Sequence, residues 1–433
     1  MKEITSLLRR DVERAIGFKL KSTTEAKVFH QLVTEKTNSS LSLSTIRRFW
    51  GLIPEKKANQ NTLNELAKFL QFKSFLDYSK HKNRYASWFD EIAIQKLKFK
   101  AKLTKEDFKL IEKQYAEHGS NLFVMNLIEY AIFNEKWQYV FDLMHPKKLA
   151  LLEDKLGITD YTTKLANLVV LFLNSLAKTR FDFAIEHLIR DENFKKYCIY
   201  IYVDVINLNK NYGEILTKIS GKAHDQQEKL FIELISALGI YYRTNKAPKI
   251  TTYAVDLDSL PAVLYGRYFG YQILYNNNQN DSNAELMYYN TFLEKLNNTA
   301  YHRDYLHEFV HHLLAAKQFA KLEHILVTFH DEIFENFHVH SYLDGFIFNL
   351  IDAMISFKNN EKKRAKTIFT HLEIDKITNE SYGDYYLIFY TIIGFHLHPK
   401  KVLQLHYQQN YDTITKQAGF NIFDSNYLDH FFD

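Results

Sequence analysis

Two short stretches of the sequence carry residue types that could do chemistry. The first, residues 41–51 (LSLSTIRRFWG), places hydroxyl side chains just before the adjacent arginines Arg47 and Arg48. Hydroxyls and guanidiniums are groups with which proteins bind phosphates and base edges. The second, residues 307–311 (HEFVH), matches the H-E-x-x-H pattern of zinc hydrolases. The first stretch therefore suggests an anion-binding surface, and the second suggests a metal site.

Residues 41–51 predict a short helix that packs on a core through one face only. We expect Ser44 to be the N-cap and Gly51 to end the helix in a left-handed turn. Ile46 and Phe49 lie three positions apart and should face the core. The hydroxyl and guanidinium side chains are then left pointing outward, where they can meet a polar or anionic partner.

Residues 307–311 raise the alternative of a zinc site. On a helix, His307 and His311 would lie one turn apart and could share a zinc ion, with Glu308 as the general base. Glu332 or Glu335 could then supply a third ligand. In this interpretation the protein is a zinc-dependent hydrolase, or it holds a metal without catalysis.

The same pentapeptide also fits an ordinary helix. Histidines are frequent around it, between His302 and His340, so the pattern arises readily by chance. Nothing nearby resembles the edge strand on which zinc proteases hold a substrate. The sequence also contains no glycine-rich phosphate loop and no G-x-S-x-G elbow. We therefore predict no catalytic residues, no metal and no cofactor, and we interpret Cys198 as a packing residue.

Composition favours a mostly helical protein of two or three domains. The chain has 433 residues, of which 46% are hydrophobic, and only 13 Gly and 5 Pro. Its single cysteine excludes an internal disulfide framework and suits a reducing compartment. The first residues lack the apolar block of a signal peptide, and the longest apolar run, 165–177, is too short to span a bilayer. We predict an all-α, cytoplasmic protein that does not contact membranes.

Positive charge is concentrated at the beginning of the chain. Residues 1–84 contain 17 Lys and Arg against 8 Asp and Glu, whereas the remaining residues carry a net charge of −5. A basic head on a mildly acidic body points to an anionic partner for the head alone.

Four helical segments are expected within the head. Glu25 follows a cluster of Ser and Thr in a capping-box pattern. The expected segments are 7–17, 22–37, 42–51 and 61–72. In the second of them, the side chains expected to face the core are Val28, Phe29, Leu32 and Val33.

Two helices joined by a short polar turn at residues 38–40 make a helix-turn-helix pattern. Here the sequence resembles the Cro/C1-type helix-turn-helix domains. The stretch LSLSTIRRFWG resembles their recognition helix, and NTLNELAKFLQF resembles the helix that follows it. The resemblance covers about residues 20–78. It departs from the family in a longer turn and in Trp50-Gly51, which replaces the usual acidic residue.

The resemblance implies that residues 1–84 bind double-stranded DNA. Hydroxyls at the start of the groove-entering helix would reach bases or phosphates, an arginine would contact guanine, and flanking lysines would contact phosphates. The implied DNA-binding residues are Ser42, Ser44, Thr45, Arg47, Arg48, Lys36, Lys56 and Lys57. Two alternatives stay open: the arginines dock the head on the acidic body, or the head binds RNA.

The body shows a loose repeat of helical hairpins. Residues 85–103 are expected to form a connecting helix, and residues 104–433 resemble a degenerate tetratricopeptide-like α-solenoid. The expected hairpins are 121–144, 165–189, 198–219, 305–326, 346–372 and 385–407, and 275–283 is expected to be a polar loop. Solenoids of this kind bind peptides or extended protein segments.

Together these expectations describe a transcriptional regulator. The architecture is similar to that of bacterial peptide-responsive regulators, in which a Cro/C1-type head precedes a tetratricopeptide body. That parallel implies a homodimer, because such heads bind paired half-sites. The main alternative is a protein-interaction scaffold that does not bind DNA.

Overall fold

Every regular element in the described part of the chain is a helix, which confirms the all-α prediction. The computed structural model describes residues 2–37, 41–54, 58–81, 92, 95–118, 122–145, 161–223, 225–251, 255–299, 302–337, 342–374, 377 and 381–433. These residues form two compact units, unit 1 (Met1–Phe123) and unit 2 (Val124–Asp433), and each is considered by itself.

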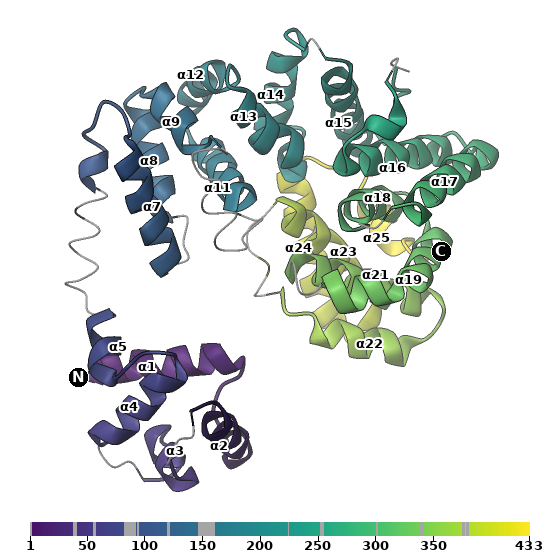
Figure 1. Ribbon diagram of the computed structural model, residues 1–433. Helices are drawn as coiled ribbons and strands as arrows, with labels where there is room; N and C mark the ends of the chain where they lie inside the picture. Colours follow the sequence, from purple (N-terminus) through teal and green to yellow (C-terminus); the bar gives the residue numbers. More distant parts are fainter. Residues whose placement is uncertain are drawn as a thin grey trace. The chain divides into compact units, whose positions relative to one another are not determined.

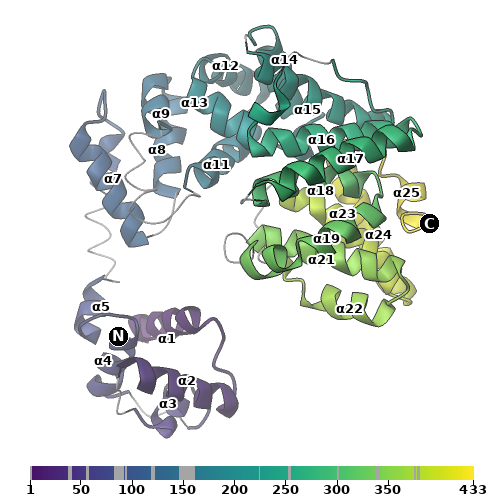
Figure 2. The ribbon, with the colours of Figure 1, turned by 45° about the vertical axis from the view of Figure 1, so that its right-hand side comes forward.

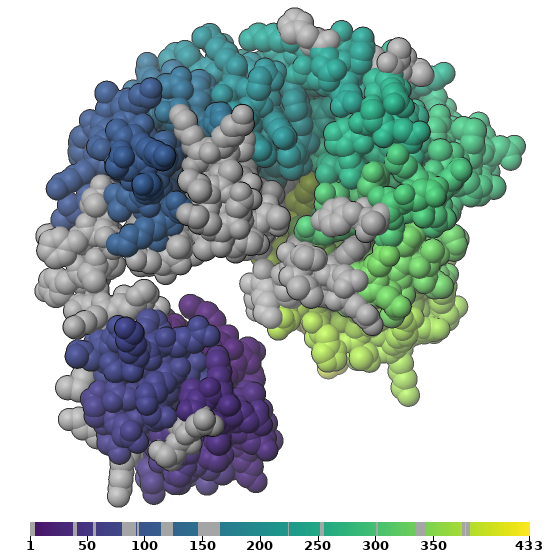
Figure 3. Space-filling model, in the orientation of Figure 1, coloured from purple at the N-terminus to yellow at the C-terminus, as the bar shows by residue number. Residues whose placement is uncertain are grey.

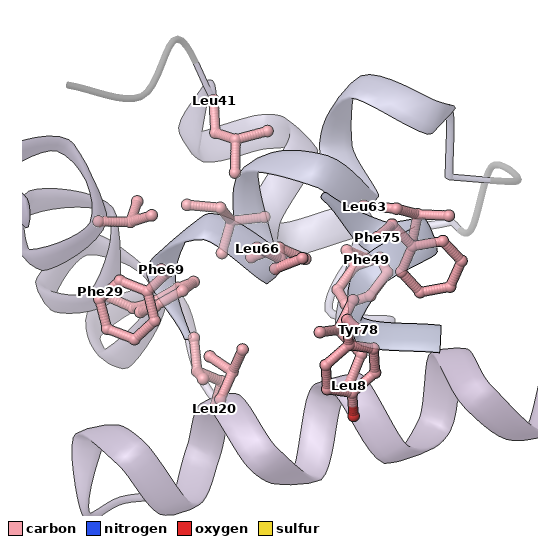
Figure 4. Packing of buried hydrophobic residues seen from close by; sticks show 14 of the residues in the cluster. Leu8, Leu20, Phe29, Leu41, Phe49, Leu63, Leu66, Phe69, Phe75 and Tyr78 are labelled. Carbon is pink, nitrogen blue, oxygen red and sulfur yellow. The ribbon is translucent and has the colours of Figure 1, made fainter. Parts of the chain in front are cut away.

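Unit 1 contains a small helical core built by its first five helices. These helices are α1 (Lys2–Ile16), α2 (Thr23–Thr37), α3 (Leu43–Phe49), α4 (Gln60–Phe69) and α5 (Phe75–His81), and α7 (Lys105–His118) follows later in the unit. Figure 4 shows how side chains from all five converge, among them Leu8, Phe29, Phe49, Leu66 and Tyr78. Ile46 and Phe49 of α3 were predicted to face the core from their spacing, and that prediction is confirmed.

The start of α2 follows the expected capping box, but one face of the helix was assigned wrongly. The Ser22 N–H donates to Glu25 Oε2 at 2.7 Å, and the Glu25 N–H donates to Ser22 Oγ at 3.3 Å. Phe29 and Val33 are buried as predicted. Val28 and Leu32, also expected to face inward, are 43% and 37% exposed. These two residues lie one helical turn apart on a face of α2 that no described helix of unit 1 covers.

The segment predicted as a connecting helix, 85–103, lies mostly outside the described residues. Leu97 is the last of its described helical residues, and Lys98–Leu103 form turns and irregular backbone. Three further positions that the sequence singled out, residues 38–40, also lie outside the described residues.

Unit 2 is a succession of helices, many of which pair through short turns (Figure 1). Its elements are α8 (Leu122–Phe133), α9 (Trp137–Leu143), α11 (Tyr161–Ser175), α12 (Lys178–Leu188), α13 (Glu192–Lys195), η1 (Lys196–Ile201), η2 (Val205–Asn207), α14 (Asn211–Ser220), α15 (Gln226–Thr244), η3 (Leu257–Ser259), α16 (Ala262–Asn278), α17 (Ser282–Asn297), α18 (Arg303–Ala315), α19 (Phe319–Thr328), η4 (Glu332–Phe337), α21 (Tyr342–Lys358), α22 (Lys362–His371), α23 (Ser381–Leu397), α24 (Lys401–Ala418) and α25 (Ser425–Asp429). None of the described helices combines the length and the apolar character needed to cross a bilayer.

Most of the expected hairpins occur, and two segments differ from expectation. The first part of 198–219 is not an α-helix, because the chain forms the π-helical turn η1 and the 3-10 turn η2 before α14 begins. The expected polar loop 275–283 is mostly helical, with α16 ending at Asn278 and α17 beginning at Ser282. Asn278 stays ordered there because its amide accepts from the Ala247 N–H at 3.0 Å and donates to the Asn245 carbonyl at 3.1 Å.

The C-terminal segment of unit 2 folds back onto the middle of the unit (Figures 1 and 2). The Ile422 N–H donates to the Tyr242 carbonyl at 3.1 Å, and the Asn209 amide donates to the Gly419 carbonyl at 3.2 Å. A strictly open helical array makes contacts between neighbouring repeats only. Unit 2 departs from that pattern, because α23 to α25 close against η2 and α15.

Two glycines allow α16 and α18 to approach closely. A Cβ atom added at Gly266 would lie 2.4 Å from the Tyr305 carbonyl oxygen, and one added at Gly270 would lie 2.8 Å from His312 Nδ1. Main chain therefore packs against main chain at Gly266, which leaves no room for a side chain.

We predict that Gly266→Ala destabilises unit 2, whereas Gly221→Ala does not. The new methyl group at position 266 would force α16 away from α18, and overpacking of this kind costs about 1–3 kcal/mol. No atom lies within 4 Å of the corresponding position at Gly221. Urea unfolding followed by circular dichroism measures both changes. Equal stabilities of the two variants would contradict the close approach.

Candidate nucleic-acid interface

Helix α3 begins earlier than the sequence suggested. Its N-cap is Ser42, whose hydroxyl oxygen accepts the Thr45 N–H at 3.2 Å, and the prediction that Ser44 is the cap is therefore wrong. Ser42 has the extended backbone of an N-cap, with φ −76° and ψ 151°. This start makes Leu43 the first helical residue and still leaves Ile46 on the buried face.

Three of the predicted DNA-binding hydroxyls gather at the N-terminal end of α3. Ser42 Oγ lies 2.9 Å from Ser44 Oγ and 2.9 Å from Thr45 Oγ1. Ser42 and Ser44 are exposed to solvent. The hydroxyls thus form a compact polar group that can both donate and accept hydrogen bonds.

The C-terminal end of α3 confirms the predicted role of Gly51. Its φ of +71° lies in the left-handed region. The Gly51 N–H donates to the Arg48 carbonyl at 3.0 Å, and the Leu52 N–H donates to the Arg47 carbonyl at 2.8 Å, which is a Schellman ending. The carbonyls of the two arginines therefore close the helix, and their side chains are partly exposed.

Neither arginine of α3 is neutralised within the described part of the chain. Arg47 and Arg48 are partly exposed and form no ion pair or side-chain hydrogen bond with another described residue. Arg47 Nε is buried without a hydrogen-bond partner. Ile46 and Phe49, which lie beside them on the helix, are 1% and 3% exposed and anchor the opposite face. Within the part of the chain that the structure describes, the two guanidiniums therefore have no carboxylate partner.

The lysines predicted to contact phosphates are only partly placed. Lys36 at the end of α2 is exposed, and its Nζ lies 4.6 Å from the centroid of the Phe69 ring. A cation over an aromatic face remains charged and partly hydrated, so it can still meet a phosphate. Lys56 and Lys57 lie outside the described residues.

Trp50, one of the departures from the Cro/C1 pattern, fixes the position of α3. Its indole N–H donates to Glu13 Oε1 at 3.0 Å, and its ring packs against Phe29 at 5.3 Å between centroids. Glu13 Oε1 also accepts the Leu20 N–H at 3.2 Å. Trp50 therefore ties α3 to α1 and α2 together. The 37 residues that separate Trp50 from Glu13 hid this contact from sequence reasoning.

The candidate general base of the H-E-x-x-H pattern is committed to a buried ion pair. Both carboxylate oxygens of Glu308 accept from the Arg267 guanidinium, at 2.7 and 2.9 Å, and the Tyr382 hydroxyl donates to Oε2 at 2.9 Å. Arg267 also donates to the carbonyls of Tyr200 and Ile201 at 2.5 and 3.0 Å. Burial alone would raise the pKa of Glu308, but Arg267 and the neighbouring donors hold it below its ordinary value.

The two histidines of the pattern have separate protein partners. His307 Nδ1 lies 2.9 Å from Asp344 Oδ1, and His311 Nε2 lies 2.9 Å from the Tyr242 hydroxyl. Burial holds the pKa of His311 well below its ordinary value, so its ring is neutral.

The further candidate ligands do not complete a metal site either. Glu332 is hydrogen-bonded to His302, and the side chain of Glu335 lies outside the described residues. No group of three or more His, Cys, Asp and Glu within the described ranges is arranged to hold a metal. Cys198 is buried, in agreement with a packing role.

Comparisons with known proteins do not assign the chain to a family. No protein-family model matches the chain, and no curated protein and no solved structure matches it. A functional proposal therefore depends on the contacts and charges described above.

We predict that Ser42→Ala loosens α3 and that Ser44→Ala does not. Loss of the N-cap hydrogen bond costs about 1 kcal/mol, whereas the exposed Ser44 caps nothing. Hydrogen exchange of the α3 amides should accordingly be about fivefold faster in Ser42→Ala. Faster exchange in Ser44→Ala alone would restore Ser44 as the cap.

We predict that Arg267→Met lowers the free energy of unfolding of unit 2 by about 3–5 kcal/mol, because it leaves Glu308 buried and unpaired. The double variant Arg267→Met/Glu308→Leu should recover much of the loss, since both charges are then removed. Arg364→Met is the matched control. Arg364 pairs with Asp352 at 2.8 Å, and its own side chain is 55% exposed. Ion pairs that are open to solvent contribute at most about 1 kcal/mol. Denaturant unfolding measures all three variants.

Proposed function

We propose that the protein is a DNA-binding transcriptional regulator, in which α2 and α3 of unit 1 act as a helix-turn-helix module. The observation that carries this proposal is the pair of guanidiniums of Arg47 and Arg48, which have no ion-pair partner among the described residues and lie on a short helix that Trp50 ties to α1 and α2. A rigid helix with free donors is suited to the major groove, where arginine pairs with guanine O6 and N7.

The hydroxyl group at the start of α3 supports the same proposal. Ser42, Ser44 and Thr45 lie together at the N-terminal end of α3. In helix-turn-helix modules this end of the second helix enters the groove, where short hydroxyl side chains contact base edges or phosphates. Lys36 and the net positive charge of residues 1–84 supply the sequence-independent attraction to the phosphate backbone. In this proposal two copies bind two half-sites, and the helical repeats of unit 2 bind a peptide or protein partner.

One observation favours a second candidate, a protein-interaction scaffold. Val28 and Leu32 form an exposed apolar pair on α2, the helix that precedes α3. Exposed apolar pairs of this kind suit a protein partner better than the phosphate-lined groove of DNA. In the scaffold, unit 1 would use this face and not bind DNA.

We predict that the full chain selects specific fragments from sheared genomic DNA, and that Arg47→Ala/Arg48→Ala abolishes the selection. Loss of base contacts should weaken binding to a selected fragment by at least about tenfold while affecting unselected DNA less. Fluorescence anisotropy over a salt series measures both affinities.

The matched control is Arg10→Ala/Arg14→Ala, which removes the same charge from α1 of the same unit. Arg14 is 76% exposed and pairs weakly with Asp11 at 3.7 Å. This variant should lower the affinity for selected and unselected DNA alike. The absence of any complex at low salt would refute DNA binding and favour the scaffold.

A further inference from the structure

Helices α22 and α24 of unit 2 are joined by a cluster of aromatic rings around the buried Phe369. The Phe369 ring of α22 lies 4.6 Å from that of Tyr390 and 6.1 Å from that of Tyr407 of α24, between centroids. His398 stacks on Tyr407 at 5.2 Å and contacts Phe369 at 6.0 Å. The outward faces of α22 and of the start of α24 therefore belong to one surface.

This surface is positively charged, although residues 85–433 carry a net negative charge. Lys363 and Lys366 precede Phe369 on α22, and Lys400 and Lys401 follow His398 at the start of α24. All four are exposed, and none forms an ion pair or side-chain hydrogen bond with another described residue. Carboxylates near α22 are already engaged: Arg364 binds Asp352 at 2.8 Å and Glu361 at 3.4 Å. The lysine charges are therefore available to a partner.

Beside the lysines, α24 turns apolar side chains to solvent. Val402 is 79% exposed and Leu405 is 52% exposed, and their spacing of three residues places them on one face of the helix. A surface helix normally presents polar residues there. We call the set Lys363, Lys366, Lys400, Lys401, Val402 and Leu405 the α22–α24 surface, and its α22 part is visible in light green in Figure 3.

We propose that the α22–α24 surface binds an acidic peptide segment of a partner protein. Apolar side chains of that segment would cover Val402 and Leu405 while its carboxylates meet the four lysines. The inference deepens the partner-binding role proposed for unit 2 and rests on it, but it is independent of DNA binding by unit 1.

The chemistry of the surface distinguishes this occupant from others. A second copy of the chain seated on the same surface would bring like charges together, which opposes a symmetric pairing. Duplex DNA would match the lysines but would leave Val402 and Leu405 facing phosphates. A bilayer surface requires a longer apolar stripe than two side chains on one helix. A peptide with one or two apolar anchors among acidic residues matches both features.

Selection of peptides from a displayed random library on the full-length protein tests the proposal. We expect the selected peptides to be rich in Asp and Glu around apolar anchors, and to bind more weakly as salt is raised. Lys363→Glu/Lys366→Glu should weaken their binding on the order of tenfold, and Val402→Ser/Leu405→Ser should do the same. Lys210→Glu/Lys222→Glu is the matched control, because it makes the same charge change at exposed lysines elsewhere in unit 2.

Each other outcome overturns the proposal. The interaction would lie elsewhere if the selected peptides were not acidic, or if they bound all variants equally. It would also lie elsewhere if the control variant weakened their binding as much as the other variants do. Binding of phosphatidylserine vesicles or of duplex DNA that is lost in the Lys363→Glu/Lys366→Glu variant, without an acidic peptide preference, would assign the surface to membrane or nucleic acid. Binding of genomic fragments by the Lys363→Glu/Lys366→Glu variant separates this proposal from DNA binding by unit 1. If DNA is bound through α3 alone, the affinity for those fragments should be unchanged in this variant.

Discussion

The buried ion pair between Arg267 and Glu308 is the constraint on which the middle of unit 2 depends. Arg267 is 1% exposed, and taking its charge out of water is costly unless every donor finds an acceptor. Its guanidinium offsets that cost by donating to Glu308 from α18 and to the carbonyls of Tyr200 and Ile201 at the end of η1. Those carbonyls end a helical turn and lack partners within it. The hydroxyl of Tyr382 from α23 completes the group. The ion pair of Arg267 and Glu308 thus joins elements from four parts of the chain.

The same constraint explains why the H-E-x-x-H pattern is not arranged as a metal site. Zinc ligation requires the two histidines and a further ligand to point their lone pairs at one centre. Here Glu308 turns toward Arg267, His307 toward Asp344 and His311 toward Tyr242. The pentapeptide alone predicts a shared target, because helical spacing puts both histidines on one face. The partners that redirect them come from α15, α16 and α21, which local sequence cannot place.

Sequence patterns predicted correctly the features that neighbouring residues determine. They failed for features that depend on residues distant in the chain. The capping box at Ser22, the left-handed Gly51 and the buried pair on α3 follow from adjacent sequence and were predicted correctly. Between Leu41 and Thr45 three hydroxyl residues could each cap a helix, and tertiary packing selected Ser42. Val28 and Leu32 were expected inside because they are apolar, but they are exposed, and none of the described helices of unit 1 covers their side of α2. The arginine within the apolar run of α16 was the one available signal of the buried ion pair, since a charge there requires a partner.

A comparison of Arg267 with Arg47 and Arg48 indicates where this chain is best suited to bind an anion. All the hydrogen bonds of Arg267 in the centre of unit 2 go to protein acceptors, so an incoming anion would have to displace Glu308. Arg47 and Arg48 on α3 have no such partner among the described residues. An anion that binds them therefore displaces no carboxylate of the described residues, and it releases the ions that screen the two charges. The energetic difference favours α3 over the buried centre as the site for a polyanion. This difference in energy arises from the surroundings of each guanidinium, because all three residues are arginines.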